Sequence, residues 1–172
     1  MSQSGSAPAP TAEFLAKLEA FRQSGIRIDA QGRFCHEGAL VEHEGFRQAL
    51  FRWLDRLPHP DGRYILRLDE NRYVYVDVED TPLLVNTLRW ENGHAMLSLS
   101  DGSEQPLDVA NITIDGDGII RTWVRSKRLE ARLSSAASAA LADAIELQPQ
   151  PQLKLSDGTL APLGPRTPWP SA

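Results

Sequence analysis

The chain has 172 residues, a formal net charge of −5, 41% hydrophobic residues and one cysteine. Its acidic charge is scattered, so it lacks the broad basic face needed to bind nucleic-acid backbones. A single cysteine excludes an internal disulfide, and no secretory leader or apolar run of about 18 residues is visible. We therefore expect a soluble, cytoplasmic protein that binds neither nucleic acid nor membranes.

The two ends of the chain differ in composition from the rest. Residues 1–10, MSQSGSAPAP, are small and polar and predict a disordered leader, and residues 164–172, GPRTPWPSA, predict a Pro-rich tail. Between them we predict an N-terminal half over residues 11–80 and a C-terminal half over residues 81–163.

A short amphipathic helix is the first predicted element. Phe14, Leu15, Leu18 and Phe21 fall at helical spacing between Thr11, a threonine N-cap, and Gly25, which is placed to end the helix. Such a helix needs an apolar surface to dock on.

Short strands and a second helix follow. Ile26 and Ile28 alternate with polar residues into a turn at 29–32, and Phe34 begins the return strand. A helix then starts near His43 or Glu44 and runs to Pro58, which stops it. The next strands are YILRL (64–68), YVYVDV (73–78), and LLVNTLRW (83–90) with HAMLSLS (94–100) around an Asn-Gly turn.

The pattern then recurs. RIDAQGRF at 27–34 matches TIDGDGII at 113–120 with an offset of 86, and LRLDENRY at 66–73 matches LKLSDGTL at 153–160 with an offset of 87. A helix predicted from Lys127 to Glu146 follows the second turn. Agreement in order and spacing over about 50 residues indicates a repeat. We predict an α+β fold of two strand-strand-helix-strand-strand units, 26–78 and 112–163, as antiparallel sheets each with a packed helix.

Short motifs in this order are similar to those of a bacterial family, domain of unknown function family 1285. The family pattern contains an aromatic-His-x-Gly motif, Asp-Gly-x-Tyr, Glu-Asp-x-Pro, Pro-Leu-x-Val, Val-Arg and Leu-Glu-Ala-Arg. This sequence shows Phe34, His36 and Gly38; Asp61, Gly62 and Tyr64; Glu79, Asp80 and Pro82; Pro106, Leu107 and Val109; Val124 and Arg125; and Leu129, Glu130, Ala131 and Arg132. It departs from the family's Pro-Ile-x-Arg at residues 40–43.

The resemblance carries expectations about fold and function. It implies a duplicated α+β core, a second half superficially like pleckstrin-homology domains, and a ligand site at the interface of the halves. For the family, a nucleotide-type ligand and a role in signal transduction are suggested. His36 coincides with the family's histidine and becomes a candidate to face the ligand.

The stretch RTWVRSKRLEAR, residues 121–132, is the most informative for binding. It gathers five basic residues around the start of the helix predicted from Lys127, where cations are unfavourable: Arg121, Arg125, Lys127, Arg128 and Arg132. One explanation is a bound anion held by helix N–H groups and arginines, with Trp123 stacked on a base. The other is that the arginines pair with Glu130 or with carboxylates of the other half, or point into water.

Other chemistry has no clear signature in the sequence. His36 and His43 are seven residues apart with Gly38 between them, which does not fit the helical spacing of zinc ligands, and the turn DGDG (115–118) lacks the glutamate of a calcium loop. We find no catalytic triad or phosphate-binding loop, and expect neither catalytic residues, nor a metal, nor a cofactor.

Two functions therefore remain open. The first is a non-enzymatic protein that binds a small phosphorylated or nucleotide-type ligand between its halves and has a regulatory or signal-transduction role. The second is a protein-interaction module whose pleckstrin-homology-like half binds a protein partner without a small ligand. An unrecognised enzyme is a third, weaker alternative, because a single sequence can hide a site assembled from distant residues.

Overall fold

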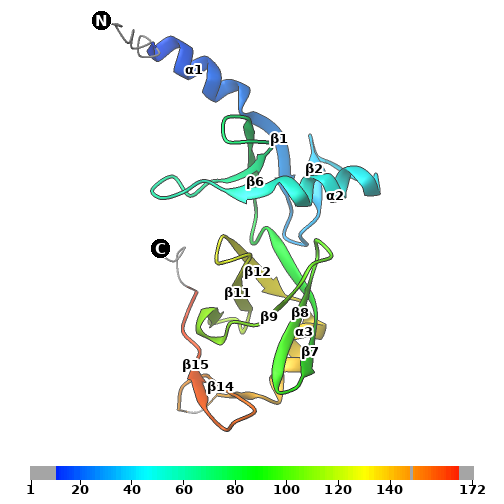
Figure 1. The fold of residues 1–172 in the computed structure, drawn as a ribbon, viewed down its shortest axis with the longest axis vertical. Helices are drawn as coiled ribbons and strands as arrows, with labels where there is room; N and C mark the ends of the chain where they lie inside the picture. Colours follow the sequence, from blue (N-terminus) through cyan, green and yellow to red (C-terminus); the bar gives the residue numbers. More distant parts are fainter. Residues whose placement is uncertain (1–10, 148, 167–172) are drawn as a thin grey trace, which may run out of the picture.

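The computed structural model describes residues 11–147 and 149–166. Within these residues the chain forms α-helices, one short 3-10 helix and three sheets, and the two halves stack along the long axis (Figure 1). The α+β class is thereby confirmed. None of the helices in this described part has the length and apolar character needed to cross a membrane.

The N-terminal half contains two helices and a six-stranded sheet in the order β3-β2-β1-β6-β5-β4. Its elements are α1 (Ala12–Phe21), β1 (Gln23–Ile28), β2 (Phe34–His36), β3 (Ala39–Leu40), α2 (Glu44–Trp53), β4 (Leu54–Arg56), β5 (Tyr64–Arg67) and β6 (Tyr73–Val78). The pairing is antiparallel except between β1 and β6, which run parallel. The expectation of purely antiparallel sheets is therefore wrong, because β1 and β6, the first and last strands of this half in chain order, are neighbours at the centre of the sheet.

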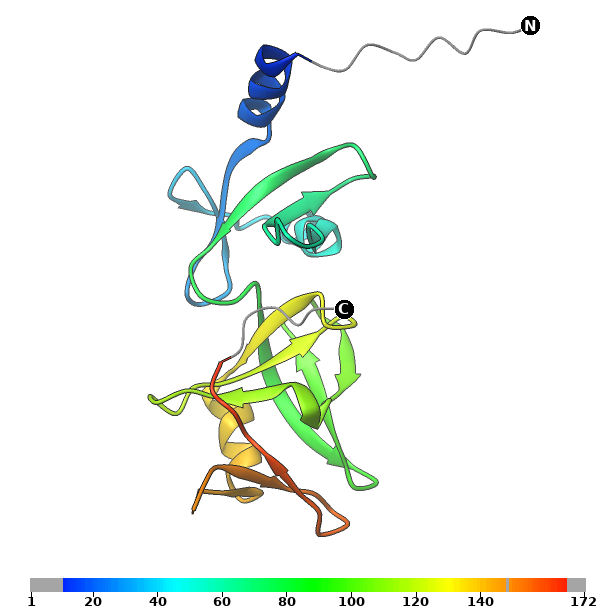
Figure 2. The same ribbon diagram turned by 90° about the vertical axis from the view of Figure 1, so that its left-hand side faces the viewer.

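The C-terminal half, from residue 81 onward, holds a second six-stranded sheet, β10-β11-β12-β7-β8-β9, and a three-stranded sheet, β13-β14-β15. The larger sheet curls into a half-barrel (Figure 2). Its elements are β7 (Leu83–Glu91), β8 (His94–Leu99), β9 (Glu104–Pro106), η1 (Val109–Asn111), β10 (Ile112–Ile114), β11 (Ile120–Val124), β12 (Leu129–Leu133), α3 (Ser135–Ala142), β13 (Ile145–Glu146), β14 (Gln152–Lys154) and β15 (Leu160–Pro162).

Strand pairing in the two halves has a common register. In β1 and β2, Ile26 faces His36, and 86 residues later Ile112 faces Thr122. The turns between these strands close alike, with Gly32 and Gly118 donating to the carbonyls of Asp29 and Asp115.

The register also agrees after the helix. Ile65 faces Tyr75, and 87 residues later Gln152 faces Pro162. The parallel pair of Arg27 and Asp77 has its counterpart in the parallel bridge of Thr113 and Gly164. The pairs shared by the two segments thus keep the offsets of 86 and 87 residues seen in the sequence.

Two predicted helices have different bounds in the structure. The helix that starts after His43 ends at Trp53, because Leu54–Arg56 pairs with β5 as strand β4. The helix predicted from Lys127 to Glu146 covers only Ser135–Ala142, because Leu129–Leu133 is strand β12 between β11 and β7. Gly25 does not end α1; it lies in β1, where the register with β6 shifts.

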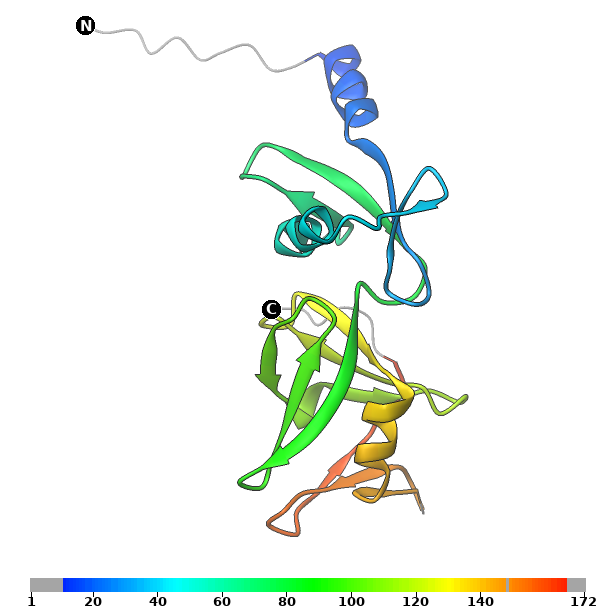
Figure 3. The ribbon, with the colours of Figure 1, turned by 90° about the vertical axis from the view of Figure 1, so that its right-hand side faces the viewer.

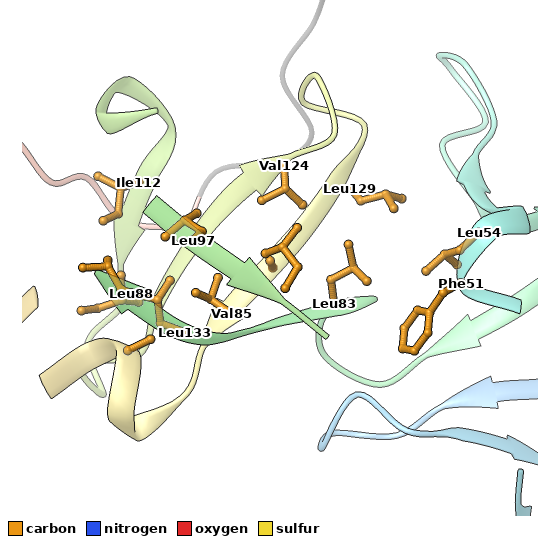
Figure 4. Close-up of a cluster of buried hydrophobic side chains, with 14 of the residues drawn as sticks. Phe51, Leu54, Leu83, Val85, Leu88, Leu97, Ile112, Val124, Leu129 and Leu133 are labelled. Atoms are coloured by element: carbon orange, nitrogen blue, oxygen red, sulfur yellow. The ribbon is translucent and has the colours of Figure 1, made fainter. Parts of the chain in front are cut away.

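The larger of two apolar clusters runs through both halves, and a smaller one, formed by Leu57, Ile65 and Tyr75, lies within the N-terminal half. Phe51 and Leu54, from α2 and β4, point toward Leu83 and Leu129 of the C-terminal half (Figure 4). All four side chains are buried, and full burial of such a side chain contributes about 1.5–3 kcal/mol. The halves therefore share apolar contacts as well as the polar contacts described next.

Candidate functional site

The basic stretch 121–132 forms a strand-turn-strand hairpin. Arg125, Ser126 and Lys127 have φ values of 48, 54 and 65°, so the chain turns with left-handed backbone and returns as β12. The helix that follows begins later, and Ser134 caps it by accepting from the N–H of Ala137. The expectation that helix N–H groups face the basic cluster is therefore wrong.

Arg121 and Arg132 both bind Asp80, which lies between β6 and β7. Arg121 is buried and places Nη2 2.9 Å from Asp80 Oδ1 and Nη1 2.6 Å from Asp115 Oδ2. Burial opposes the charge of Arg121, but its hydrogen bonds to Asp115 and Asp80 raise its pKa above the ordinary value. Arg132 lies 3.0 Å from Asp80 Oδ2 and donates to the carbonyl of Ala30 at 2.6 Å.

Arg125 bridges the halves from the start of the left-handed turn. Its guanidinium binds Asp101 and donates to the carbonyls of Leu54 and Phe51, at 3.1 and 3.0 Å. The Asp101 side chain is only 2% exposed. Its burial opposes ionisation, but hydrogen bonds from Ser103 and Arg125 outweigh that effect and hold the pKa of Asp101 below its usual range.

Arg128 completes this set by donating to Asp55 Oδ1 at 2.8 Å and to the carbonyl of Arg56 at 2.9 Å. We call Arg121, Arg125, Arg128 and Arg132 the arginine junction. Each of them binds a carboxylate or carbonyl oxygen in residues 11–80, so these arginines join the C-terminal half to the N-terminal half. Pairing with carboxylates of the other half, part of the second explanation offered by the sequence, accounts for the contacts of Arg121, Arg128 and Arg132. Arg125 instead pairs with Asp101 of its own half and reaches the other half through carbonyl groups.

The other predicted site residues lie elsewhere. Trp123 is buried, and the guanidinium carbon of Arg56 is 5.5 Å from the centroid of its ring, so the indole is not open to stack on a ligand. Lys127 is exposed in the left-handed turn. His36 ends β2 with an exposed side chain beside Gly25. The structure brings together the arginines of the cluster but not His36.

His43 has a local structural role. It is the N-cap of α2, and its Nδ1 accepts a hydrogen bond of 3.1 Å from the N–H of Phe46. In the part of the chain that the structure describes, no three His, Cys, Asp or Glu side chains are grouped to hold a metal ion.

A cleft of about 310 Å³ lies between the halves, near the lower end of the volumes typical of ligand pockets. The N-terminal half contributes the β1–β2 turn, β3 and α2, and the C-terminal half contributes β7 and the residue after β8. We call it the inter-half cleft; it is lined by Gln31, Gly32, Arg33, Phe34, Leu40, Val41, Glu42, Arg47, Phe51, Leu84, Asn86 and Ser100.

Close packing of the β1–β2 turn on β7 shapes this cleft. Gly32 has a φ of 73°, and a Cβ there would lie 2.9 Å from Leu84 Cγ, so the turn approaches β7 more closely than a larger residue allows. The ring of Phe34 meets that of Phe51 edge-on, with centroids 4.9 Å apart. The cleft therefore has an apolar floor.

Charged and polar groups surround that floor. Arg33 pairs with Asp29, and Arg47 pairs with Glu44, which leaves further N–H groups on each guanidinium. Among residues 11–147 and 149–166, no hydrogen bond engages Nη1 of Arg33 or Nε and Nη1 of Arg47. The arrangement suits a small ligand with an apolar or aromatic part and an anionic group.

Sequence reasoning missed Arg33 and Arg47. Arg33 follows the Asp-Ala-Gln-Gly turn, and Arg47 lies on the first turns of α2, where its pair with Glu44 has ordinary i,i+3 spacing. The only signal for the site was the implied interface between the halves.

Comparisons with known proteins bear on the fold. No family model matches the sequence, and no curated protein is significantly similar to it. A DUF1285 family protein from Silicibacter pomeroyi DSS-3 has a similar structure, with a TM-score of 0.67 and 19% identity over 83% of this chain and 81% of that one. Another, from Shewanella baltica OS155, has a TM-score of 0.58 and 20% identity over 70% of this chain and 91% of that one.

At this level of identity the likeness establishes the fold. The structural neighbours belong to the family whose motifs the sequence resembles. The alignment with the Silicibacter pomeroyi protein covers 83% of this chain and therefore includes parts of both halves. The chain therefore has the fold of DUF1285 family proteins.

Proposed function

We propose that this chain is a non-enzymatic protein with a regulatory or signal-transduction role that binds a small anion, of phosphorylated or nucleotide type, in the inter-half cleft. The observation that carries the proposal is the pair of half-exposed arginines, Arg33 and Arg47, at a cleft that both halves line. Arginine is well suited to phosphate because its planar fork donates two parallel hydrogen bonds.

The remaining lining supports a ligand with a ring. Leu40 and Val41 offer accessible apolar surface against which a base can lie, while Gln31 and Asn86 supply amide donors and acceptors at the edge. The arginine junction contributes in a different way, because it holds the two walls of the cleft at a fixed separation.

Duplication of one ancestral unit is part of the same proposal. The shared pairing registers at offsets of 86 and 87 residues support a common origin for segments 26–78 and 112–163. A site formed between two related halves, the second of them pleckstrin-homology-like, then resembles the interface site implied for the family.

Thermal denaturation with a panel of nucleotides and phosphorylated metabolites tests the proposal. A ligand at 100 times its Kd stabilises the folded state by about 2.7 kcal/mol. For a chain of this size that corresponds to a rise in Tm of roughly 5–10 °C. The panel includes inorganic phosphate alone, which separates a phosphate site from a site that also needs the base.

Matched variants locate the site. Arg33→Ala with Arg47→Ala is expected to weaken binding at least tenfold, because two charge-assisted contacts are lost. Arg89→Ala is the control, since Arg89 is a similarly exposed arginine paired with Glu104 outside the cleft. Failure of every ligand to raise the Tm, or equal binding by the double variant and the control, would reject the proposed function.

The second function, a peptide-binding C-terminal half, has less support. Large exposed apolar side chains are more frequent in the N-terminal half, where they include Leu15, Phe21, Phe46 and Leu68, than in the C-terminal half, where they are Trp90, Leu147 and Leu160. Exposed apolar clusters mark interaction surfaces. A pull-down from native extract tests this alternative, with the wild-type full chain and its Trp90→Ala variant as baits. Recovery of no partner by the wild type, or equal recovery by both baits, would count against it.

A further inference from the structure

Helix α1 is attached to the rest of the N-terminal half largely through polar contacts. Glu19 accepts hydrogen bonds from Arg63 at 2.8 Å and from the hydroxyl of Tyr75 at 2.7 Å. The guanidinium of Arg22 stacks over the ring of Tyr73, 4.1 Å from its centroid. These contacts hold the C-terminal end of the helix at the edge of the sheet.

Three large apolar side chains of α1 remain uncovered. Leu15, Leu18 and Phe21 are exposed, and Phe21 is 84% exposed. The helix lies at the end of the molecule farthest from the C-terminal half (Figure 3). A helix of ten residues is marginal in water by itself, and apolar spacing of this kind normally faces a packed surface.

An apolar groove begins beside the same side chains. Its volume is about 370 Å³, and its walls come from α1, α2 and the β5–β6 hairpin. The apolar side chains that line it include Leu18 and Phe21 of α1, Phe46 and Trp53 of α2, Leu66 of β5 and Val74 of β6. No residue that lines this groove also lines the inter-half cleft.

We propose that this surface is the interface of a two-fold symmetric homodimer, in which α1 of each chain lies in the groove of the other. The occupant is a second copy because one chain carries both parts of a helix-in-groove contact, an amphipathic helix and a groove, side by side. A two-fold interface requires such a self-complementary patch.

The available area supports a stable dimer. Leu15, Leu18, Phe21, Phe46 and Leu68 expose between a third and most of their side chains, which amounts to about 400 Å² of apolar surface per chain. A symmetric contact covers this patch twice, about 800 Å². With the usual polar rim the total is about 1,300 Å², within the range of specific interfaces.

Charge around the groove is compatible with this occupant. Arg22 and Arg72 line the groove, and Arg72 is 75% exposed although it pairs with Asp69. The first turn of α1 carries Glu13, whose side chain is highly exposed and pairs with Lys17. An incoming α1 therefore brings the exposed Glu13–Lys17 pair to a groove with basic residues at its edge, where the Glu13 carboxylate can exchange its lysine partner for an arginine.

Light scattering on the full chain during size-exclusion chromatography tests the proposal. The wild type is expected to elute with twice the mass of one chain at submillimolar concentration. Phe21→Glu, which changes the helix, and Phe46→Glu, which changes the groove, are each expected to give monomers. Both side chains are exposed in one chain, so circular dichroism of the variants should match the wild type. Leu160→Glu on β15 is the control and should remain dimeric, because Leu160 is as exposed as Phe46 and lies outside the groove.

Three results would overturn the proposal. A wild-type protein that is monomeric at submillimolar concentration has no such interface. This holds also if the monomer binds phosphatidylcholine vesicles, because the patch then contacts lipid and not a second chain. A dimer that survives both variants uses another surface. A dimer lost in Phe21→Glu but kept in Phe46→Glu pairs helix with helix and leaves the groove empty.

Discussion

Replacement of Arg125 by alanine is the most direct test of the arginine junction. The substitution leaves the Asp101 carboxylate without its guanidinium and removes the donors to the carbonyls of Phe51 and Leu54. Removing one partner of a fully buried pair costs about 3–5 kcal/mol. Because the Arg125 side chain is 29% exposed, water can replace part of the lost contact, and we expect a loss of about 2–4 kcal/mol.

Urea denaturation at neutral pH measures this loss. Arg128→Ala is the matched control, since Arg128 also bridges the halves but is 49% exposed, and its pair should contribute about 1 kcal/mol or less. Position 125 has a φ of 48° with either side chain, so the backbone cost of the left-handed conformation largely cancels. If Arg125→Ala lost no more than Arg128→Ala, the reasoning that burial of Asp101 governs the junction would be refuted.

Three further outcomes are expected. The pKa of Asp101 is lowered in the folded state, so its carboxylate contributes stability above about pH 4 that is lost as the pH falls through the folded pKa. Asp101→Asn should therefore be less stable than the wild type at pH 7, and the difference in unfolding free energy should narrow below about pH 4 in acid titrations. Gly32→Ala should lower the free energy of unfolding by about 2–4 kcal/mol in thermal denaturation, because left-handed strain adds to the clash with Leu84. Gly102→Ala, with a φ of 82° and open space around the new methyl group, should lower it by only about 1–2 kcal/mol, and equal losses would contradict the close approach of the turn to β7. Ser126→Gly should raise stability by about 0.5 kcal/mol because it relieves a φ of 54°, and a clear loss would argue against the left-handed turn.

Local turn chemistry made several elements predictable. The Asn92-Gly93 hairpin formed as expected, with both residues at positive φ, and so did the turn in which Asp29 accepts from the N–H groups of Gln31 and Arg33. The strand YVYVDV was predicted with its observed bounds. In these cases residues close in sequence determine the conformation, so a single sequence contains the information.

The bounds of the helix predicted from Lys127 to Glu146 depended on distant residues. Leu129–Leu133 reads LEARL, which consists of strong helix formers, yet it pairs with β7, where Arg132 faces Leu84. Tertiary pairing overrode the local preference, and the site that depended on a helix start at Lys127 was misplaced. Arg33 and Arg47 could not be linked from the sequence either, because the packing of the Gly32 turn on Leu84 forms the cleft beside them.

The parallel pairing of β1 and β6 gives the N-terminal unit a direction. In a parallel pair the chain enters the first strand and leaves the last strand at opposite ends, separated here by six residues of strand, about 20 Å. α1 therefore lies at one end and the connection to the C-terminal half at the other, as Figure 2 shows. The parallel bridge of Thr113 and Gly164 shows that the second unit is also entered and left at opposite ends, but its exit returns to the junction, where Arg166 lies 3.5 Å from Asp80. The exits of both units therefore meet at the junction, and the chain has to turn back between residues 80 and 112, the span that holds β7, β8 and β9.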